Sequence, residues 1–162
     1  MSTDLFKRIS SAALYQPFAD KIHKLAAACQ ARGVDYWCIS GERTYAEQAA
    51  LYNQGRTTPG IIVTQAKAGQ SMHNFAIAAD FCMDKKTTRD GLQPDYTDPA
   101  YAILGEEAGK LGLEWGGVWK FKDIPHVQLP IGKVGLKLFD LQQAYAKGGK
   151  AGLFALLDKY QW

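Results

Sequence analysis

Apolar residues near the start of the chain recur at the spacing of an amphipathic helix. They are three or four positions apart, and so share one face of a helix with 3.6 residues per turn. These positions are Leu14, Phe18, Ile22, Leu25 and Cys29. Glycine commonly follows the last turn of a helix. The pattern therefore predicts a helix that ends at Gly33.

The next part of the chain combines a strand pattern, a helix pattern and a loop. The apolar and aromatic segment 34–39 indicates a strand. Thr44 and Glu47 have the spacing of a capping box, which predicts a helix that runs on to Gly55. Residues 56–70 contain proline and glycine and show no sustained period, so we expect a loop with at most one short strand.

The remaining elements alternate between short strands and helices. The apolar run 76–83 predicts a buried strand. Asp98 and Pro99 are suited to cap and open a helix that ends at Gly112. The last elements are a short strand at 126–129 and helices at 134–146 and 153–160, separated by Gly148 and Gly149. This mixed order predicts the α+β class, with a small antiparallel sheet flanked by helices.

Composition indicates one domain that needs neither disulfides nor a structural metal to be stable. The chain has 162 residues, 47% of them hydrophobic and 22% charged, which predicts a single domain over 1–162 with residues 132–162 as a helical tail packed on it. The three cysteines have no CxxC spacing and are expected to be buried thiols. The sequence has no run of eighteen apolar residues and its start lacks a signal-peptide core, so we expect no stable membrane insertion.

The net charge of +3 is concentrated at the end of the chain. Residues 133–162 carry five lysines against two aspartates. This bias is typical of a solvated helix face, or of a segment attracted to an anionic polymer such as the bacterial wall. The lysines are too widely spread for a nucleic-acid-binding stripe, so no nucleic-acid partner is expected.

Two short segments pair histidine with a carboxylate. His73 is followed by Asp80, and Asp123 is followed by His126. Zinc in hydrolytic sites commonly takes three nitrogen or oxygen ligands, which His73, Asp80 and His126 would supply. Seven residues span about 23 Å as a strand or about 10 Å as a helix, so the chain is expected to bend between His73 and Asp80.

The second segment is expected to present its polar residues on one face of a strand. His126 and Gln128 alternate with Val127, which should point into the core. We interpret Gln128 as a hydrogen-bond partner of a ligand.

Three segments in this order resemble the zinc peptidases of bacterial cell walls, a family that includes D-alanyl-D-alanine carboxypeptidases and L-alanyl-D-glutamate endopeptidases. They are SGERTYAEQAALYNQG at 40–55, SMHNFAIAADF at 71–81 and EWGGVWKFKDIPHVQ at 114–128. The match spans most of residues 38–128 and keeps the family's order and spacing.

The resemblance implies a role for each matching residue. His73, Asp80 and His126 would bind one zinc ion per chain, on the predicted sheet. Asp123 would be the general base, and Arg43 would bind substrate and stabilise the oxyanion. A structural ion pair of Arg43 with a nearby glutamate or a core carboxylate is the alternative for that residue.

Other matching positions bear on the substrate groove. Ser71 matches a position that contacts substrate in the family. Trp119 and Trp115 are candidates to line the groove or to fill the core. Ala76 stands where relatives usually have glycine.

The expected function is hydrolysis of peptidoglycan stem peptides by a zinc metallopeptidase. An aspartate at the position of Asp123 resembles the endopeptidase and phage-lysin branch, which favours the L-alanyl-D-glutamate bond; D-alanyl-D-alanine carboxypeptidase activity is the alternative. A wall substrate for a chain without a signal peptide predicts a monomeric phage or prophage endolysin, made in the host cytoplasm and acting on the periplasmic wall during host lysis.

Two further classes of protein are less consistent with the sequence. A non-catalytic cell-wall-binding zinc module would have no need of Asp123 or Arg43. A structural zinc domain would be expected to supply a fourth Cys or His ligand, and none has a suitable spacing.

Overall fold

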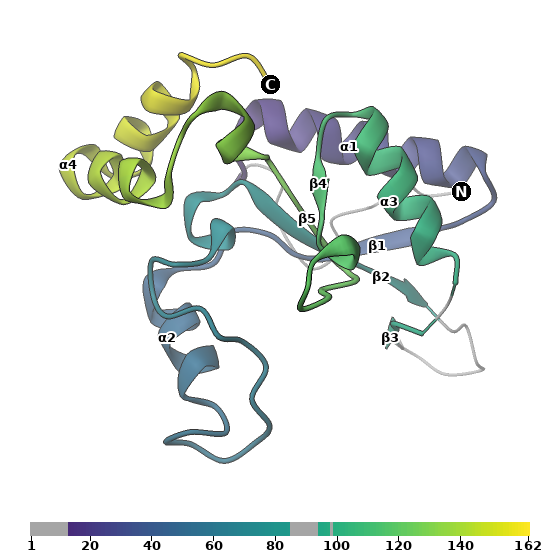
Figure 1. Cartoon of the computed structure of the whole chain (residues 1–162), viewed down its shortest axis with the longest axis horizontal. Coiled ribbons are helices and arrows are strands. Elements are labelled where there is room, and N and C mark those ends of the chain that lie inside the picture. The colour runs from purple at the N-terminus through teal and green to yellow at the C-terminus, as the bar shows by residue number, and fades with distance from the viewer. Residues whose placement is uncertain (1–12, 85–93, 98) are drawn as a thin grey trace.

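Helices and a small sheet alternate along the chain, as the α+β prediction requires (Figure 1). The computed structural model describes residues 13–84, 94–97 and 99–162. The helices are α1 (Gln16–Ala31), α2 (Tyr45–Asn53), α3 (Tyr101–Lys110) and α4 (Leu138–Leu157), with short 3-10 helices η2 (Met72–Phe75), η3 (Gly116–Val118) and η4 (Ile131–Val134). The strands are β1 (Tyr36–Ser40), β2 (Ala78–Asp84), β3 (Pro94–Asp95), β4 (Glu114–Trp115) and β5 (His126–Gln128).

The strands form one antiparallel sheet in the order β1-β2-β5-β4, with β3 paired to β2. Strand β2 is therefore central, and its neighbours fix which residues lie opposite each other. Asp80 pairs with His126 across β2 and β5, and Glu114 pairs with Gln128 across β4 and β5. These registers confirm the expected small antiparallel sheet.

The core lies between helix α1 and one face of the sheet. Helix α1 buries the predicted apolar stripe, including Phe18, Ile22 and Leu25. From β2, Ala79 and Phe81 join this core. Because successive side chains of a strand point to opposite faces, Asp80 is directed to the other side of the sheet. All three cysteines are buried thiols, as expected.

Several element boundaries differ from the predictions. Helix α3 begins at Tyr101 rather than Pro99, and its N-cap is Ala100, which has no capping side chain; Asp98 lies outside the described residues. The loop at 56–70 is confirmed: it contains no named strand, and an isolated bridge joins Gln54 and Thr58.

The end of the chain consists of two helical segments that meet at Gly149, as the glycine pair predicts. Helix α4 begins at Leu138, four residues after the predicted start, because the 3-10 helix η4 occupies the preceding turn. The glycine pair marks the junction between the two segments. Gly149 has φ 60° and ψ −152°, a conformation outside the helical region, and helix continues on both sides of it.

Helix α4 packs beside the segments that lead to the candidate site. Tyr145 stacks on Tyr45 at the start of α2, with ring centroids 5.4 Å apart. Gln142 donates a hydrogen bond to the Gly69 carbonyl, and Lys150 forms an ion pair with Glu42. The tail thus contributes one of its lysines to an internal contact.

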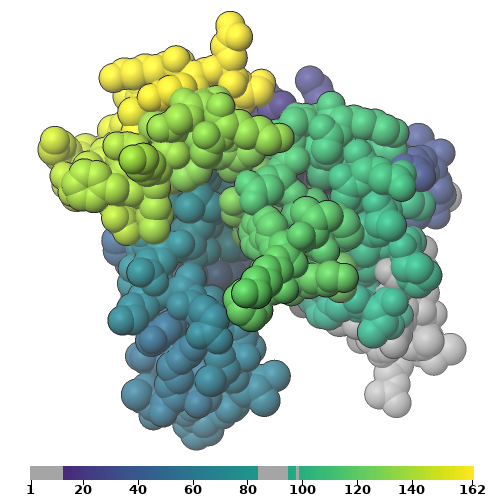
Figure 2. Space-filling view, viewed as in Figure 1, coloured from purple at the N-terminus to yellow at the C-terminus, as the bar shows by residue number. Residues whose placement is uncertain are grey.

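Helix α2 and the loop after it project away from the sheet (Figure 1). Figure 2 shows a notch between this blue-teal part of the molecule and the green segment that precedes β5. Within the described ranges, none of the helices combines the length and the apolar character that crossing a membrane requires.

Candidate metal centre and substrate cleft

A sharp bend brings His73 close to Asp80. His73 lies in η2, whose first turn is capped by the Ser71 hydroxyl, which accepts a hydrogen bond from the His73 backbone N–H. Ala76 then adopts a left-handed conformation with φ 58°, and β2 begins two residues later. His73 Nε2 consequently lies 3.2 Å from Asp80 Oδ2.

The left-handed conformation of Ala76 accounts for the glycine that the family resemblance leads us to expect at this position. Ala76 is the only non-glycine residue with positive φ among the described residues. A left-handed conformation costs an L-residue roughly 1–2 kcal/mol. The chain therefore accepts some strain to make the turn between two candidate ligands.

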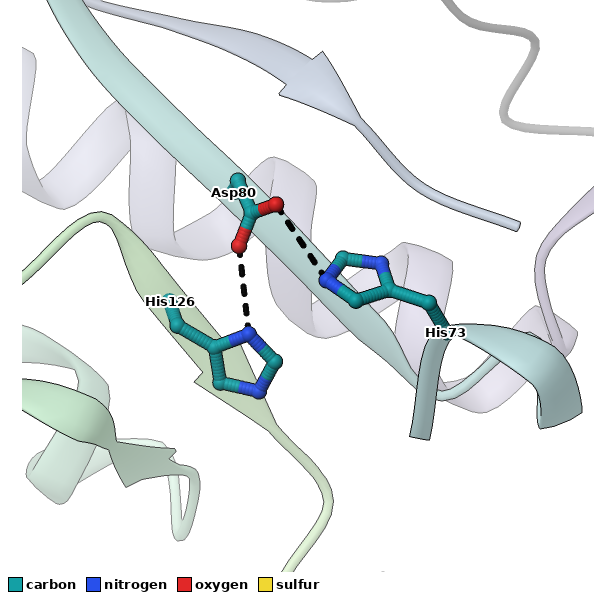
Figure 3. A group of neighbouring side chains, drawn as sticks. All are labelled: His73, Asp80 and His126. Carbon is teal, nitrogen blue, oxygen red and sulfur yellow. Dashed lines mark hydrogen bonds and ion pairs between the residues drawn. The ribbon is translucent and has the colours of Figure 1, made fainter. Parts of the chain in front are cut away.

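His126 reaches the same carboxylate from the neighbouring strand. Its Nδ1 lies 3.1 Å from Asp80 Oδ1, so each carboxylate oxygen faces one imidazole (Figure 3). One ligand atom from each of His73, Asp80 and His126 lies within 4.8 Å of the others. The structure thus brings together the three residues that the sequence singled out.

The hydrogen bonds of each imidazole indicate which nitrogen is available to a metal. His73 Nδ1 lies 2.6 Å from the Gly41 carbonyl oxygen, which can only accept, so Nδ1 carries the hydrogen and Nε2 is left free. His126 Nε2 lies 2.9 Å from Gln128 Oε1. With a hydrogen on Nε2, His126 would offer its Nδ1 to the metal.

The charges in this cluster are strongly coupled. Burial would raise the pKa of Asp80, but the two imidazoles and their hydrogen bonds outweigh it and lower that pKa well below its usual range. Burial likewise opposes protonation of His126, yet the bond to Asp80 raises the pKa of His126. In the absence of a metal, the site therefore favours an ionised carboxylate beside a protonated imidazole.

Asp123 lies at the edge of this cluster. Its Oδ2 is 3.8 Å from His126 Nδ1, and its side chain is 49% exposed. The Asp123 backbone N–H donates to the Gly116 carbonyl at 2.9 Å, which ties the residue to the turn after β4. Burial raises the pKa of Asp123, partly offset by the nearby imidazole of His126. A carboxylate placed here is suited to exchange protons with a molecule held at the centre.

Arg43 approaches the cluster from the loop before α2. Its guanidinium donates to Gln48 Oε1 at 2.9 Å and to Ser40 Oγ at 3.2 Å. Its Nη2 lies 3.9 Å from Asp80 Oδ2. Glu47, one of the nearby glutamates that could pair with Arg43, instead closes the capping box of α2. Arg43 is thus held in place with its charge at the candidate metal centre.

A cleft of about 800 Å³ opens over these residues. It is lined by Arg43, Ser71 and Trp119, together with the three candidate ligands. The lining also includes apolar residues whose side chains are largely exposed, among them Ile62 and Phe121. The notch in Figure 2 corresponds to this cleft.

The two tryptophans have different positions. Trp115 packs against the core and donates to the Ile124 carbonyl. Trp119 lines the cleft, and its ring centroid lies 5.2 Å from that of His126. Of the two candidates for the groove, only Trp119 is therefore placed to contact a ligand there.

Three residues around the site did not stand out in the sequence. Gln48 is fully buried and holds Arg43. Gly116 accepts the backbone bond from Asp123. Glu114 accepts hydrogen bonds from both Trp119 and Gln128. Knowing that β4 pairs with β5 would have placed Glu114 opposite Gln128. A two-residue strand, however, has too little pattern for its register to be predicted.

The donor set fits a zinc ion. Two imidazole nitrogens and one carboxylate are ligands that zinc prefers, and three protein ligands leave a position for water. Each histidine uses its other nitrogen for a hydrogen bond, as metal-binding histidines usually do.

Comparison with known proteins identifies related peptidases. A family model described as D-alanyl-D-alanine carboxypeptidase matches residues 64–129. The peptidoglycan L-alanyl-D-glutamate endopeptidase CwlK of Bacillus subtilis is 42% identical over 113 residues, which cover 65% of this chain. The chain spans 66% of the length of that relative.

Solved structures share the fold at lower identity. The L-Ala D-Glu endopeptidase ChiX of Serratia marcescens superposes with a TM-score of 0.50 and 19% identity, over 84% of this chain and 100% of its own. The LD-carboxypeptidase LdcB gives 0.52 and 17%, over 76% and 65%. The D,D-dipeptidase VanXYg gives 0.52 and 21%, over 80% and 58%.

Proposed function

We propose that this chain is a zinc-dependent endopeptidase of peptidoglycan stem peptides, on the basis of its match to the D-alanyl-D-alanine carboxypeptidase family model and its likeness to CwlK. The observation that carries the proposal is the cluster of His73, Asp80 and His126, with Asp123 and Arg43 at its edge in an open cleft. Asp80 thus lies beside two imidazoles that can bind zinc and one guanidinium that can stabilise an oxyanion.

Each residue at the centre has a distinct part in the proposed mechanism. Zinc held by His73, Asp80 and His126 would supply a water of lowered pKa and an electrophile for the peptide carbonyl. Asp123 accepts the proton of the attacking water and then donates it to the leaving amine. Arg43, which is always ionised, places positive charge beside the oxyanion that develops on the carbonyl.

The L-alanyl-D-glutamate bond is the proposed site of cleavage. CwlK, at 42% identity, is named for that activity, and the aspartate at position 123 is the residue that favoured this branch. D-Alanyl-D-alanine carboxypeptidase activity is the alternative, and the matching family model is named for it.

Two synthetic substrates separate these alternatives. One is a stem peptide that contains L-alanyl-D-glutamate and ends before D-alanyl-D-alanine, and the other contains only the terminal D-alanyl-D-alanine bond. The proposal expects zinc-dependent cleavage of the first, with a new amino end on D-glutamate. Cleavage of the second alone would establish the carboxypeptidase. A folded, zinc-loaded protein that cleaves neither would be a wall-binding module.

We further propose that the enzyme acts as a monomeric endolysin. It would be made in the cytoplasm of the host and reach the periplasmic wall during lysis. Expression with an added export signal is then expected to lyse a Gram-negative host, whereas expression without one is not. Lysis in neither case, with active enzyme present, would contradict this role, and sedimentation velocity tests the monomer.

A further inference from the structure

A carboxylate outside the ligand set is linked to His126 by hydrogen bonds. Glu114 and Gln128 lie directly opposite each other on β4 and β5. Gln128 Nε2 lies 3.5 Å from Glu114 Oε2, and Gln128 Oε1 lies 2.9 Å from His126 Nε2. The three side chains therefore form a chain that runs from the edge strand to a candidate ligand.

The carboxylate at the end of this chain determines the orientation of the amide. An ionised glutamate can only accept hydrogen bonds, so the NH2 group of Gln128 must face Glu114. Its oxygen then faces His126, which must carry its hydrogen on Nε2. In the neutral imidazole that binds a metal, the lone pair then lies on Nδ1, the nitrogen that faces Asp80 and the metal centre.

The other oxygen of Glu114 holds the wall of the cleft. Trp119 Nε1 donates to Glu114 Oε1 at 2.7 Å, and the Trp119 ring lies against the His126 ring. Glu114 is therefore committed to two donors on different elements. Because these two hydrogen bonds hold the Glu114 carboxylate, it does not turn toward the metal centre. Glu114 therefore acts on that centre through Gln128 and Trp119.

We propose that Glu114 is a positioning residue that fixes, through Gln128, the tautomer in which His126 binds zinc. This inference rests on the proposed zinc site. Groups that orient metal-bound histidines commonly contribute 10–100-fold to metal affinity.

Glu114→Gln tests the proposal because it removes the obligate acceptor and keeps the shape. The new amide at position 114 can donate toward Gln128, which can then rotate its own amide and present NH2 to His126, so that the hydrogen on Nδ1 is favoured. We expect zinc to bind about 10–100-fold more weakly in competition with a chromophoric chelator. Glu106→Gln is the matched control, since Glu106 pairs with Arg32 at an exposed surface and should leave zinc affinity unchanged.

A reciprocal exchange provides the rescue. In Glu114→Gln with Gln128→Glu, the new carboxylate accepts from His126 Nε2 and from the amide at position 114, whose oxygen accepts from Trp119. Zinc affinity should return to within a few-fold of the parent value. A merely structural role for Glu114 predicts no such recovery.

Long-range 1H–15N NMR of the zinc-loaded parent protein examines the tautomer without any substitution. The proposal expects hydrogen on His126 Nε2 and metal on Nδ1. The opposite assignment, or full zinc affinity in folded Glu114→Gln, overturns it. If the parent protein itself binds no zinc, the proposed function fails and the inference fails with it. The same titration distinguishes this result from a loss of affinity confined to the variant.

Discussion

A single methyl group at Gly116 is predicted to displace the general base. A Cβ built on Gly116 would lie 2.4 Å from the Asp123 carbonyl oxygen and 3.0 Å from the Asp123 Cβ. Ordinary contacts begin at 3.4 Å, so the segment that carries Asp123 must move by about 1 Å. The substitution Gly116→Ala is the perturbation.

A shift of this size should affect proton transfer more than metal binding. Misplacing a catalytic group by about 1 Å costs about 100-fold in rate, which corresponds to about 2.7 kcal/mol in the activation barrier. The ligands His73 and Asp80 are on other elements, but the His126 backbone N–H donates to the same Asp123 carbonyl at 3.1 Å. Zinc affinity is therefore expected to fall less than kcat/KM rather than to stay unchanged. The assay is kcat/KM on the stem peptide, measured beside zinc affinity and thermal unfolding.

Gly109→Ala is the matched control. Gly109 lies in α3, and a Cβ there would meet no atom within 4 Å. Alanine in a helix should stabilise the protein by about 0.5–1 kcal/mol and leave activity unchanged. A folded Gly116→Ala protein with parent activity would refute the claim that this close approach positions Asp123.

Other consequences of the site can be measured directly. Asp123→Asn removes the proposed base, so it should keep zinc and lower kcat by about 10²–10⁴-fold. Chromatography of the released peptide measures this loss. Arg43→Lys keeps the charge but loses the fork that contacts Gln48 and Ser40, so kcat should fall on the order of tenfold or more in the same assay; near-normal turnover would favour a structural role. Zinc at 100 times its Kd should stabilise the protein by about 2.7 kcal/mol, a rise in Tm of about 5–11 °C for a domain of this length, and Asp80→Ala should abolish the rise in a thermal shift assay. The pKa of His126 is raised in the folded protein, so its protonation stabilises the metal-free protein fully below the ordinary pKa of 6.5. This contribution is lost as pH rises through the folded-state pKa, and denaturant melts should show the free energy of unfolding falling there. An unchanged free energy of unfolding between pH 6 and 9 would contradict the shift.

Local patterns in the sequence were sufficient for most of the fold. The stripe of α1 and the capping box of α2 depend on residues within a few turns of each other, and both are confirmed. The start of α3 was wrong because Ala100, rather than a side-chain cap, precedes it. The predicted division of the tail at the glycine pair is confirmed, because the backbone of Gly149 lies outside the helical region.

In the candidate site, too, sequence predicted the features that depend on nearby residues and missed those that depend on strand pairing. The spacing of His73 and Asp80 predicted a bend, and the left-handed Ala76 provides it. The contact between Glu114 and Gln128 depends on pairing two strands of two and three residues, which sequence alone does not determine. The same holds for Gly116, whose importance comes from the backbone of a residue seven positions later.

The most direct test of the account is mass spectrometry of purified peptidoglycan after incubation with the protein. The digestion is run with zinc, with a chelator, and with zinc restored after chelation. The account predicts soluble fragments with new amino ends on D-glutamate, lost with the chelator and regained with zinc. The same fragments in the presence of the chelator, or none from folded and zinc-loaded protein, would contradict it.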